Sequence, residues 1–127
     1  MAIFKYPDYN CLSEAAGEHI VERLKNSETC LIGLSTGFSP RLTYAHIGKQ
    51  LSLIPSLVEK VTGFQLDEWY GLSGENPGSC RHYINMNVIK PWNLNSDQCF
   101  CIDGQHLDHK FQISEMKKCL NRRPMDI

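Results

Sequence analysis

The sequence lacks several features that would mark particular classes of protein. No apolar run among its 127 residues approaches the roughly 20 needed to span a membrane, and the N-terminus lacks the apolar core of a signal peptide. Lys and Arg number 13 against 14 Asp and Glu, so there is no basic stripe for nucleic acid. Internal repeats and low-complexity linkers are also missing. These absences predict one soluble, cytoplasmic protein that binds neither nucleic acid nor a membrane.

The six cysteines form neither a disulfide framework nor a zinc motif. A framework is typical of short secreted chains, and no secretion signal is present. Only Cys99 and Cys101 are closely spaced, and in a strand their thiols would share a face instead of forming a zinc knuckle. The pair His106 and His109 has no matching partner pair. The sequence therefore predicts free thiols and no metal.

Apolar periodicity predicts strands that alternate with helices. Helices are expected at residues 9–25, 40–51, 80–90 and around 113–120, and strands at 29–34, 60–66 and 98–102. The first helix would bury Leu12, Ala16, Ile20 and Leu24. Ser39 and Ser79 are suited to cap the second and third helices. This order is typical of an α/β fold with a Rossmann-like parallel sheet and flanking helices.

The end of the sequence is unusual for such a fold. Residues 125–127 look like the first residues of a fourth strand. A parallel sheet of three strands and the start of a fourth leaves a flank exposed that is normally buried. We therefore expect residues 1–127 to be the N-terminal part of a single domain, truncated part-way.

The turn after the first strand has the layout of a phosphate-binding loop. Gly37 permits close approach of the backbone, and Ser35, Thr36 and Ser39 offer hydroxyl groups near a helix N-terminus. The turn matches neither the Walker motif nor Gly-x-Gly-x-x-Gly. From spacing alone, an ordinary strand-to-helix turn is an equally good interpretation.

Two adjacent carboxylates, Asp67 and Glu68, follow the second strand. Ligands of parallel sheets bind at the carboxyl ends of the strands, and a carboxylate there suits abstraction of a proton next to a carbonyl. Phe64 and Leu66 would lie beneath the pair. One carboxylate would face the site and the other would orient a partner. An arbitrary Asp-Glu pair on a surface loop would have no role, but this one follows an apolar strand in an α/β pattern.

At these two motifs the sequence resembles the glucosamine-6-phosphate deaminase and isomerase family. Residues 34–44 (LSTGFSPRLTY) are similar to the family's phosphate loop, Leu-x-Thr-Gly-x-Thr-Pro. Residues 64–72 (FQLDEWYGL) and 77–79 (PGS) are similar to its Asp-Glu-aromatic-x-Gly-Leu segment. The form QLDEW followed by PGSCR is closer to the galactosamine-6-phosphate branch. The 6-phosphogluconolactonases share the fold but continue Asp-Glu-Arg, whereas Trp69 stands here.

The resemblance implies an activity and a set of site residues. Asp67 would move the proton between carbon-2 and carbon-1 of the opened amino sugar, in an isomerisation that releases ammonia and leaves a ketose phosphate. Glu68 would belong to the catalytic pair, with a less defined role. Ser35, Thr36, Gly37, Phe38 and Ser39 would surround the phosphate or neighbouring hydroxyls. The partner would be a small sugar phosphate, and no metal or organic cofactor is implied. A homo-oligomer is compatible with the family.

Two departures from the family pattern affect these expectations. The Asp/Asn-Gly-His turn and the glutamate that complete the family's site lie downstream of a strand that begins near residues 125–127. Without that C-terminal half, the chain alone is expected to be inactive. Phe38 stands where a small residue is common and would narrow the sugar pocket. Two alternatives stay open: a sugar-phosphate lactone hydrolase, and a non-catalytic sugar-phosphate-binding fragment.

Overall fold

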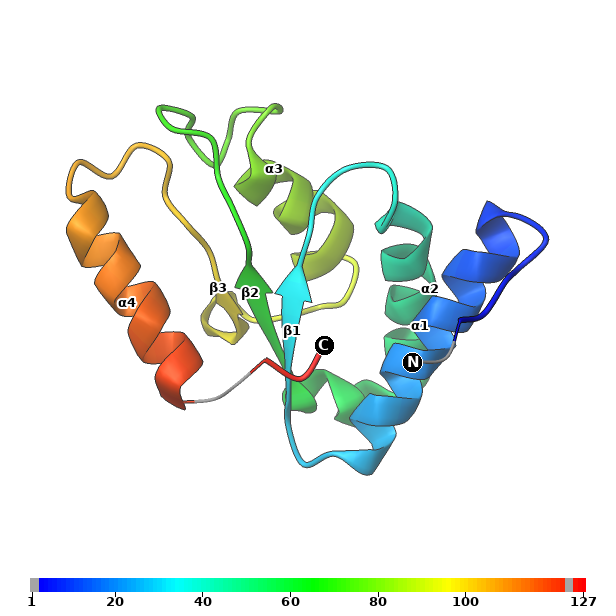
Figure 1. Ribbon diagram of the computed structural model, residues 1–127. Helices are drawn as coiled ribbons and strands as arrows, with labels where there is room; N and C mark the ends of the chain where they lie inside the picture. Colours follow the sequence, from blue (N-terminus) through cyan, green and yellow to red (C-terminus); the bar gives the residue numbers. More distant parts are fainter. Residues whose placement is uncertain (1–2, 123–124) are drawn as a thin grey trace.

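The computed structural model describes residues 3–122 and 125–127. Figure 1 shows the strands and the helices that flank them. The strands are β1 (Cys30–Leu34), β2 (Val61–Gln65) and β3 (Cys99–Phe100). The helices are α1 (Tyr9–Asn26), α2 (Arg41–Leu53), α3 (Cys80–Ile84) with its π-helical continuation η2 (Asn85–Ile89), and α4 (His109–Arg122), with short 3-10 turns at Pro55–Lys60 and Ser96–Gln98. No helix in the described ranges is long and apolar enough to cross a membrane.

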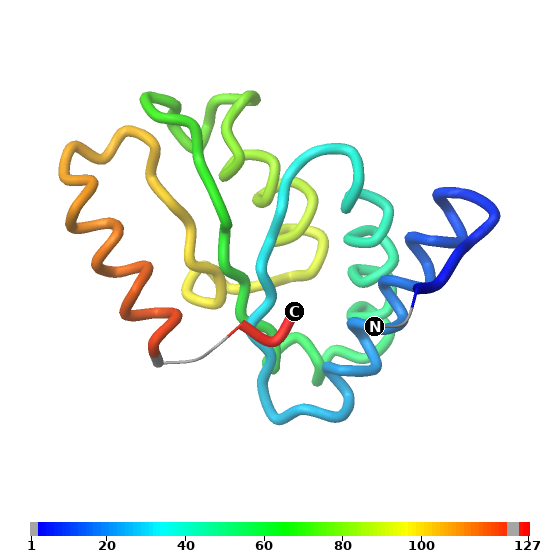
Figure 2. Tube along the Cα trace, viewed as in Figure 1, coloured from blue at the N-terminus to red at the C-terminus, as the bar shows by residue number. Residues whose placement is uncertain are grey.

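The sheet is parallel, with the strand order β1-β2-β3. The C-terminal residues pair with the free edge of β1: the Gly33 N–H donates to the Ile127 carbonyl at 2.8 Å, and the Asp126 N–H donates to the Leu31 carbonyl at 2.9 Å. Figures 1 and 2 show this red segment beside β1. The order is therefore 3-2-1-4, that of a Rossmann half-sheet, and the predicted α/β class with its nascent fourth strand is confirmed.

One face of the sheet carries the main core. Alternation along β1 sends Cys30, Ile32 and Leu34 to this face. They pack into one buried cluster with residues of the helices, namely Val21 and Leu24 of α1, Tyr44, Ile47 and Leu51 of α2, and Ile84, Val88 and Trp92 of the α3–η2 segment and its end. The short apolar strands thus fold because each finds a helix to cover it.

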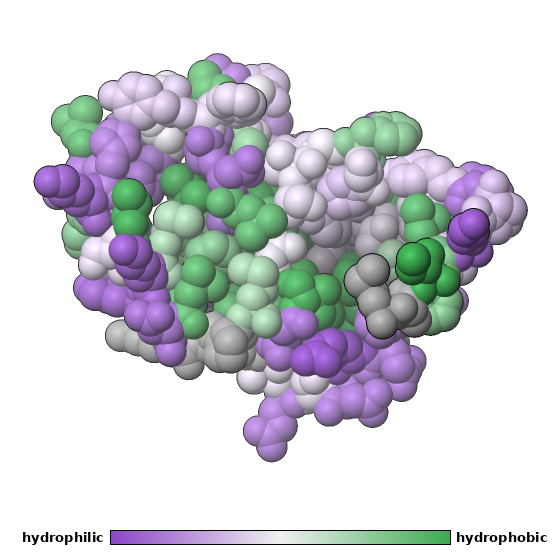
Figure 3. All heavy atoms as spheres, viewed as in Figure 1, coloured by the Kyte–Doolittle hydropathy of each residue, from purple (hydrophilic) through white to green (hydrophobic). Residues whose placement is uncertain are grey.

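The opposite face is covered less completely. A side chain at Gly33 would meet the Met125 sulfur and one methyl group of Leu66, so these two residues lie together over β1. Leu66 is 44% exposed and Met125 is 38% exposed. Figure 3 shows apolar surface between α4 and β1 on this side. The expectation that Leu66 lies buried beneath Asp67 is therefore wrong, whereas Phe64, at 2% exposure, is buried as expected.

The buried stripe of α1 matches the prediction at Leu24, but nearer the start of the helix it is shifted by one residue. Ser13, Gly17, Val21 and Leu24 are the buried residues, whereas Leu12 is 48% exposed. The reason is close contact with α2, where a Cβ at Gly17 would lie only 2.7 Å from the His46 ring. Small residues therefore face α2, and the larger Leu12 is displaced toward solvent.

Candidate functional site

Three segments meet at the carboxyl edge of the sheet. They are the 35–40 turn after β1, the loop after β2, and the start of α3, which lie together above the strands in Figure 1. Cys80 joins them, since its sulfur lies 3.6 Å from the Thr36 hydroxyl oxygen. Burial raises the pKa of the Cys80 thiol, the Thr36 hydroxyl opposes this, and the nearby Asp67 carboxylate raises it further. The two motifs singled out in the sequence are therefore neighbours in space.

The 35–40 turn is held by three tyrosines from three different helices. The Tyr44 hydroxyl donates to the Ser35 carbonyl at 2.8 Å, the Tyr83 hydroxyl donates to the Gly37 carbonyl at 2.6 Å, and the Tyr9 hydroxyl donates to the Phe38 carbonyl at 2.6 Å. Each bond engages a carbonyl oxygen. The turn is therefore fixed from the outside by its acceptors.

The backbone N–H donors of the 35–40 turn remain available. Within the described part of the chain, the N–H groups of Thr36, Gly37, Phe38 and Ser39 have no hydrogen-bond acceptor. Gly37 has φ of +101°, and no other atom lies within 4 Å of the place that a Cβ would occupy, so glycine is required by the backbone angle and not by crowding. Free N–H groups at a turn that opens a 13-residue helix suit an anion.

The side chains of the turn differ in part from expectation. The residue at the N-cap of α2 is Pro40, which supplies no side-chain cap, so the prediction that Ser39 caps this helix is wrong. The Phe38 ring stacks on Tyr9 with the ring centres 4.9 Å apart and remains 72% exposed. Ser35 and Ser39 are exposed and Thr36 is half-buried. Thr36 is therefore the hydroxyl best placed beside Cys80.

Glu68 is a hydrogen-bond acceptor for the start of α3. Its Oε2 accepts from the Ser79 hydroxyl at 2.7 Å and from the Arg81 N–H at 2.8 Å, and its Oε1 accepts from the Cys80 N–H at 2.9 Å. Its own loop contributes the Trp69 N–H at 2.8 Å. Burial alone would raise the pKa of Glu68, but these bonds outweigh it and hold that pKa below its ordinary value of 4.5. The carboxylate stays charged and ties the β2 loop to α3.

Gln65 makes a second connection that sequence reasoning missed. This residue is fully buried at the end of β2. Its Nε2 donates to the Asp67 carbonyl at 2.7 Å and to Glu68 Oε2 at 3.2 Å, and its Oε1 accepts from the Ile102 N–H at 3.1 Å. A polar residue at the end of an apolar strand was the available signal. We call this set of bonds the Gln65 bridge.

Asp67 differs from its neighbour. Its main-chain carbonyl is held by Gln65, whereas the residue as a whole is exposed. Its negative charge lies close enough to raise the pKa of the Cys80 thiol, and Cys80 in turn contacts Thr36. The backbone is thus fixed while the carboxylate is open to a ligand. A carboxylate that is exposed beside this turn is available to accept a proton from a bound molecule.

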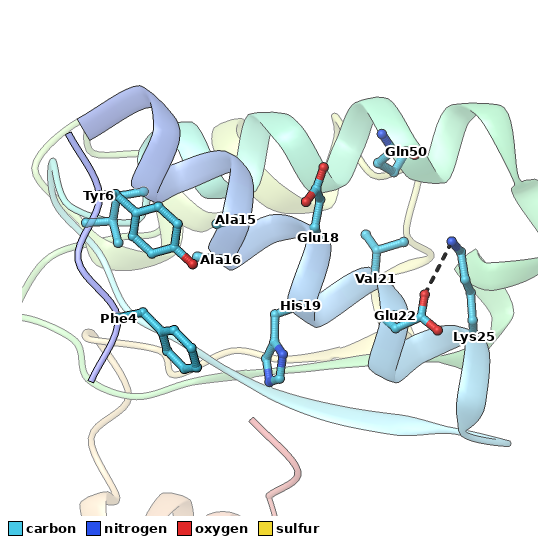
Figure 4. A pocket seen from close by; sticks show the side chains of 11 residues that line it. Phe4, Tyr6, Ala15, Ala16, Glu18, His19, Val21, Glu22, Lys25 and Gln50 are labelled. Atoms are coloured by element: carbon cyan, nitrogen blue, oxygen red, sulfur yellow. Dashed lines mark ion pairs between the residues drawn. The ribbon is translucent and has the colours of Figure 1, made fainter. Parts of the chain in front are cut away.

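A separate hollow lies away from these residues. Its volume is about 930 Å³. Figure 4 shows it along α1, between the N-terminal segment and the outer face of the helix. Phe4, Tyr6 and Leu12 supply its apolar wall, and the Lys25–Glu22 ion pair at 3.6 Å lies at its end. It contains none of the predicted site residues. No group of three or more His, Cys, Asp or Glu in the described ranges is placed to hold a metal.

No family model matches the chain. The chain is 30% identical to a glucosamine-6-phosphate deaminase of Clostridium tetani over 97% of its own length and 51% of that protein. The corresponding protein of Clostridium novyi is 31% identical over the whole chain and 53% of that protein, and that of Clostridium acetobutylicum is 31% identical over 85% and 45%. The chain thus spans about half the length of the curated relatives it matches.

A solved structure shares the fold. The structure of a monomeric glucosamine-6-phosphate deaminase, described as a missing link of the NagB superfamily, superimposes with a TM-score of 0.86. It covers 96% of this chain and 51% of that one, at 24% identity. The likeness confirms the Rossmann-like architecture.

Proposed function

Because the chain belongs to the glucosamine-6-phosphate deaminase family, we propose that it supplies the phosphate-binding turn and the proton-transferring base of an amino-sugar-phosphate isomerase that releases ammonia. The observation that carries this proposal is the pairing of unsatisfied N–H groups at Thr36–Ser39 with the exposed Asp67 carboxylate across Cys80. Residues 1–127 would form the N-terminal part of a single domain.

The chemistry follows from the two halves of this site. The turn would bind the 6-phosphate through backbone N–H groups, which leaves the opened sugar extended toward Asp67. Asp67 would take the proton from carbon-2 and return it to carbon-1, while the carbon-1 oxygen gains a proton and the amino nitrogen loses one. The resulting imine at carbon-2 would be hydrolysed by water to a ketose 6-phosphate and ammonia. Turn and base together would position the reacting carbon, which is the main contribution that binding energy makes to such a step.

Glu68 and Gln65 would act as positioning residues. The oxygens of Glu68 are engaged by donors of α3 and of its own loop, and Gln65 holds the carbonyl of Asp67. Neither group has a free proton acceptor directed to a ligand. We therefore assign the proton transfer to Asp67 and the orientation of its loop to Glu68.

The sugar epimer is a finer part of the proposal. The sequence QLDEW followed by PGSCR favours galactosamine 6-phosphate, whereas the named relatives are glucosamine-6-phosphate deaminases. Titration calorimetry with galactosamine 6-phosphate, glucosamine 6-phosphate and inorganic phosphate would separate the two. We expect the galactosamine compound to bind more tightly than its epimer, and both to bind more tightly than phosphate.

The Asp67→Asn variant tests the role of the base. In deuterated water, we expect a complete protein that also carries the C-terminal half to catalyse exchange of the carbon-2 hydrogen of the open-chain sugar only when Asp67 is intact, while sugar-phosphate affinity stays within a few-fold in the variant. Binding without exchange in either form would favour a non-catalytic sugar-phosphate-binding fragment. Release of acid from a sugar-phosphate lactone would instead favour the hydrolase.

A further inference from the structure

Two thiols lie in contact behind the candidate site. The Sγ atoms of Cys99 and Cys101 are 3.6 Å apart, and both cysteines are free. Cys99 is 7% exposed and pairs in register with Gly63, where a Cβ would lie only 2.8 Å from the Cys99 sulfur. Gly63 therefore leaves the space that the Cys99 thiol fills. Cys101 is half-buried and lies just beyond the end of β3.

The two thiols are not equivalent. A hydrogen bond with Cys99 lowers the pKa of Cys101 against the effect of burial, and the positive charge of Arg81 lowers it further, while Glu68 opposes this. The same hydrogen bond, followed by burial, raises the pKa of Cys99. Cys101 is also the more exposed thiol of the two, since it is half-buried whereas Cys99 is 7% exposed. It is the better nucleophile of the pair.

We propose that Cys99 and Cys101 form a redox-active dithiol that closes to an internal disulfide by exchange with a small disulfide such as oxidised glutathione. The Cys101 thiolate attacks one glutathione sulfur, forms a mixed disulfide and releases one glutathione thiolate. The Cys99 thiol then loses its proton and attacks the Cys101 sulfur, which releases the second glutathione. Two electrons pass from the protein thiols to glutathione disulfide, which becomes two glutathione thiols.

Closure would bend the chain after β3. Residues two apart in a strand have Cα atoms roughly 6.6 Å apart, near the upper end of the range of about 4.4–6.8 Å that disulfides tolerate. The sheet register ends at Phe100, so Cys101 is the residue that moves. The next N–H, that of Ile102, donates to Gln65 Oε1. The bend would therefore strain the Gln65 bridge, which holds Asp67 and Glu68.

Thiol mapping tests the first half of the proposal. The chain is incubated with oxidised glutathione, and the remaining thiols are alkylated. After digestion, the mass of the peptide that contains Cys99 and Cys101 is measured by mass spectrometry. We expect this peptide to lose the mass of two hydrogens and to carry no alkyl group. Cys11 and Cys119, in contrast, should each carry one alkyl group or one glutathione. The Cys99→Ser variant should accumulate glutathione on Cys101, and Cys101→Ser should leave Cys99 reduced. A wild-type peptide that stays reduced, or that stops at a glutathione adduct, would overturn the proposal.

Amide hydrogen exchange tests the coupling to the site. Oxidation of the wild-type chain should accelerate exchange at Ile102 and in the loop at residues 67–69, with α2 unchanged. The Cys101→Ser variant under the same oxidant should show no acceleration. Disulfide formation with unchanged exchange at these positions would refute the coupling. Neither readout depends on the proposed isomerase activity, so failure here and failure there are distinguishable.

Discussion

At the scale of single residues, Glu68 shows how a carboxylate in a site can serve structure. It accepts hydrogen bonds from the Ser79 hydroxyl and from the N–H groups of Trp69, Cys80 and Arg81. The Glu68→Gln variant replaces one acceptor oxygen by a donor that faces other donors. We expect the free energy of unfolding to fall by about 1–3 kcal/mol, as measured by urea unfolding.

The matched control for this change is Glu75→Gln. Glu75 lies exposed in the same loop, and it takes part in no side-chain hydrogen bond or ion pair within the described ranges. Its variant should change the free energy of unfolding by less than about 0.5 kcal/mol. Equal effects of the two substitutions would contradict the capping role of Glu68.

The same carboxylate predicts a pH dependence. The pKa of Glu68 is lower in the folded chain than its ordinary value of 4.5, so its stabilising contribution is complete above that value. The contribution is lost as the pH falls below 4.5 and through the folded pKa. Wild-type unfolding free energy should therefore decrease more steeply than that of Glu68→Gln in acid, and parallel curves for the two proteins would argue against this assignment.

Gly37 and Gly71 form a matched pair for testing the turn. Both have positive φ, +101° and +84°, and both have open space where a Cβ would lie. Alanine at either position should destabilise the fold by a similar amount, about 1–2 kcal/mol, because only the backbone angle is strained. Only Gly37→Ala should also weaken binding of inorganic phosphate in titration calorimetry. Equal losses of phosphate affinity in Gly37→Ala and Gly71→Ala would show that the 35–40 turn is not the anion-binding site.

At the scale of elements, α1, α2 and α3 jointly determine the shape of the turn. Tyr83 on α3 donates to the Gly37 carbonyl at 2.6 Å. The Tyr83→Phe variant should lose about 0.5–1.5 kcal/mol of stability and weaken phosphate binding, because the loop loses one of its three supports. Tyr70→Phe is the control, since Tyr70 is exposed and its hydroxyl makes no hydrogen bond in the described part of the chain. A Tyr83→Phe chain with unchanged phosphate affinity would show that the loop holds its shape without this bond.

The elements themselves were predictable, but their contacts were less so. Continuous apolar runs predicted β1 and β2 within one or two residues, and the Ser79 cap of α3 was confirmed by its bond from the His82 N–H. The first part of the buried stripe of α1 was missed, although Leu24 was predicted correctly, because helix contact there uses Ser13 and Gly17, which do not look like core residues. Hydrophobic periodicity detects large side chains and not close backbone approach.

The candidate site shows the same division. Two motifs could be identified because each follows a strand, and parallel strands bring their carboxyl ends together. The role of Glu68 could not be read from the sequence, because its partners are backbone N–H groups of α3 more than ten residues later. The tyrosines that support the turn come from three helices, so no short sequence motif predicts their contacts with it.

At the scale of the whole molecule, the sheet has one covered and one partly open face. Helices α1, α2 and α3–η2 build the core against Ile32 and Leu34, whereas Leu66 and Met125 over Gly33 remain partly exposed. Parallel sheets normally have both faces covered. Among the described residues, the open face is thus a departure from the fold class, and it adjoins the loop that carries Asp67.

This open face predicts how the chain binds a hydrophobic dye. Leu66→Ser removes an apolar side chain from it, whereas Leu53→Ser removes the leucine that ends α2, which is 69% exposed. We expect only Leu66→Ser to reduce fluorescence of an anilinonaphthalene dye, because contiguous apolar surface binds such dyes and isolated side chains do not. Both variants should lose less than about 1.5 kcal/mol of stability, since neither side chain is fully buried. Equal dye binding by the two variants would mean that Leu66 and Met125 do not form one continuous apolar surface. This face of the sheet would then offer no binding site for the dye.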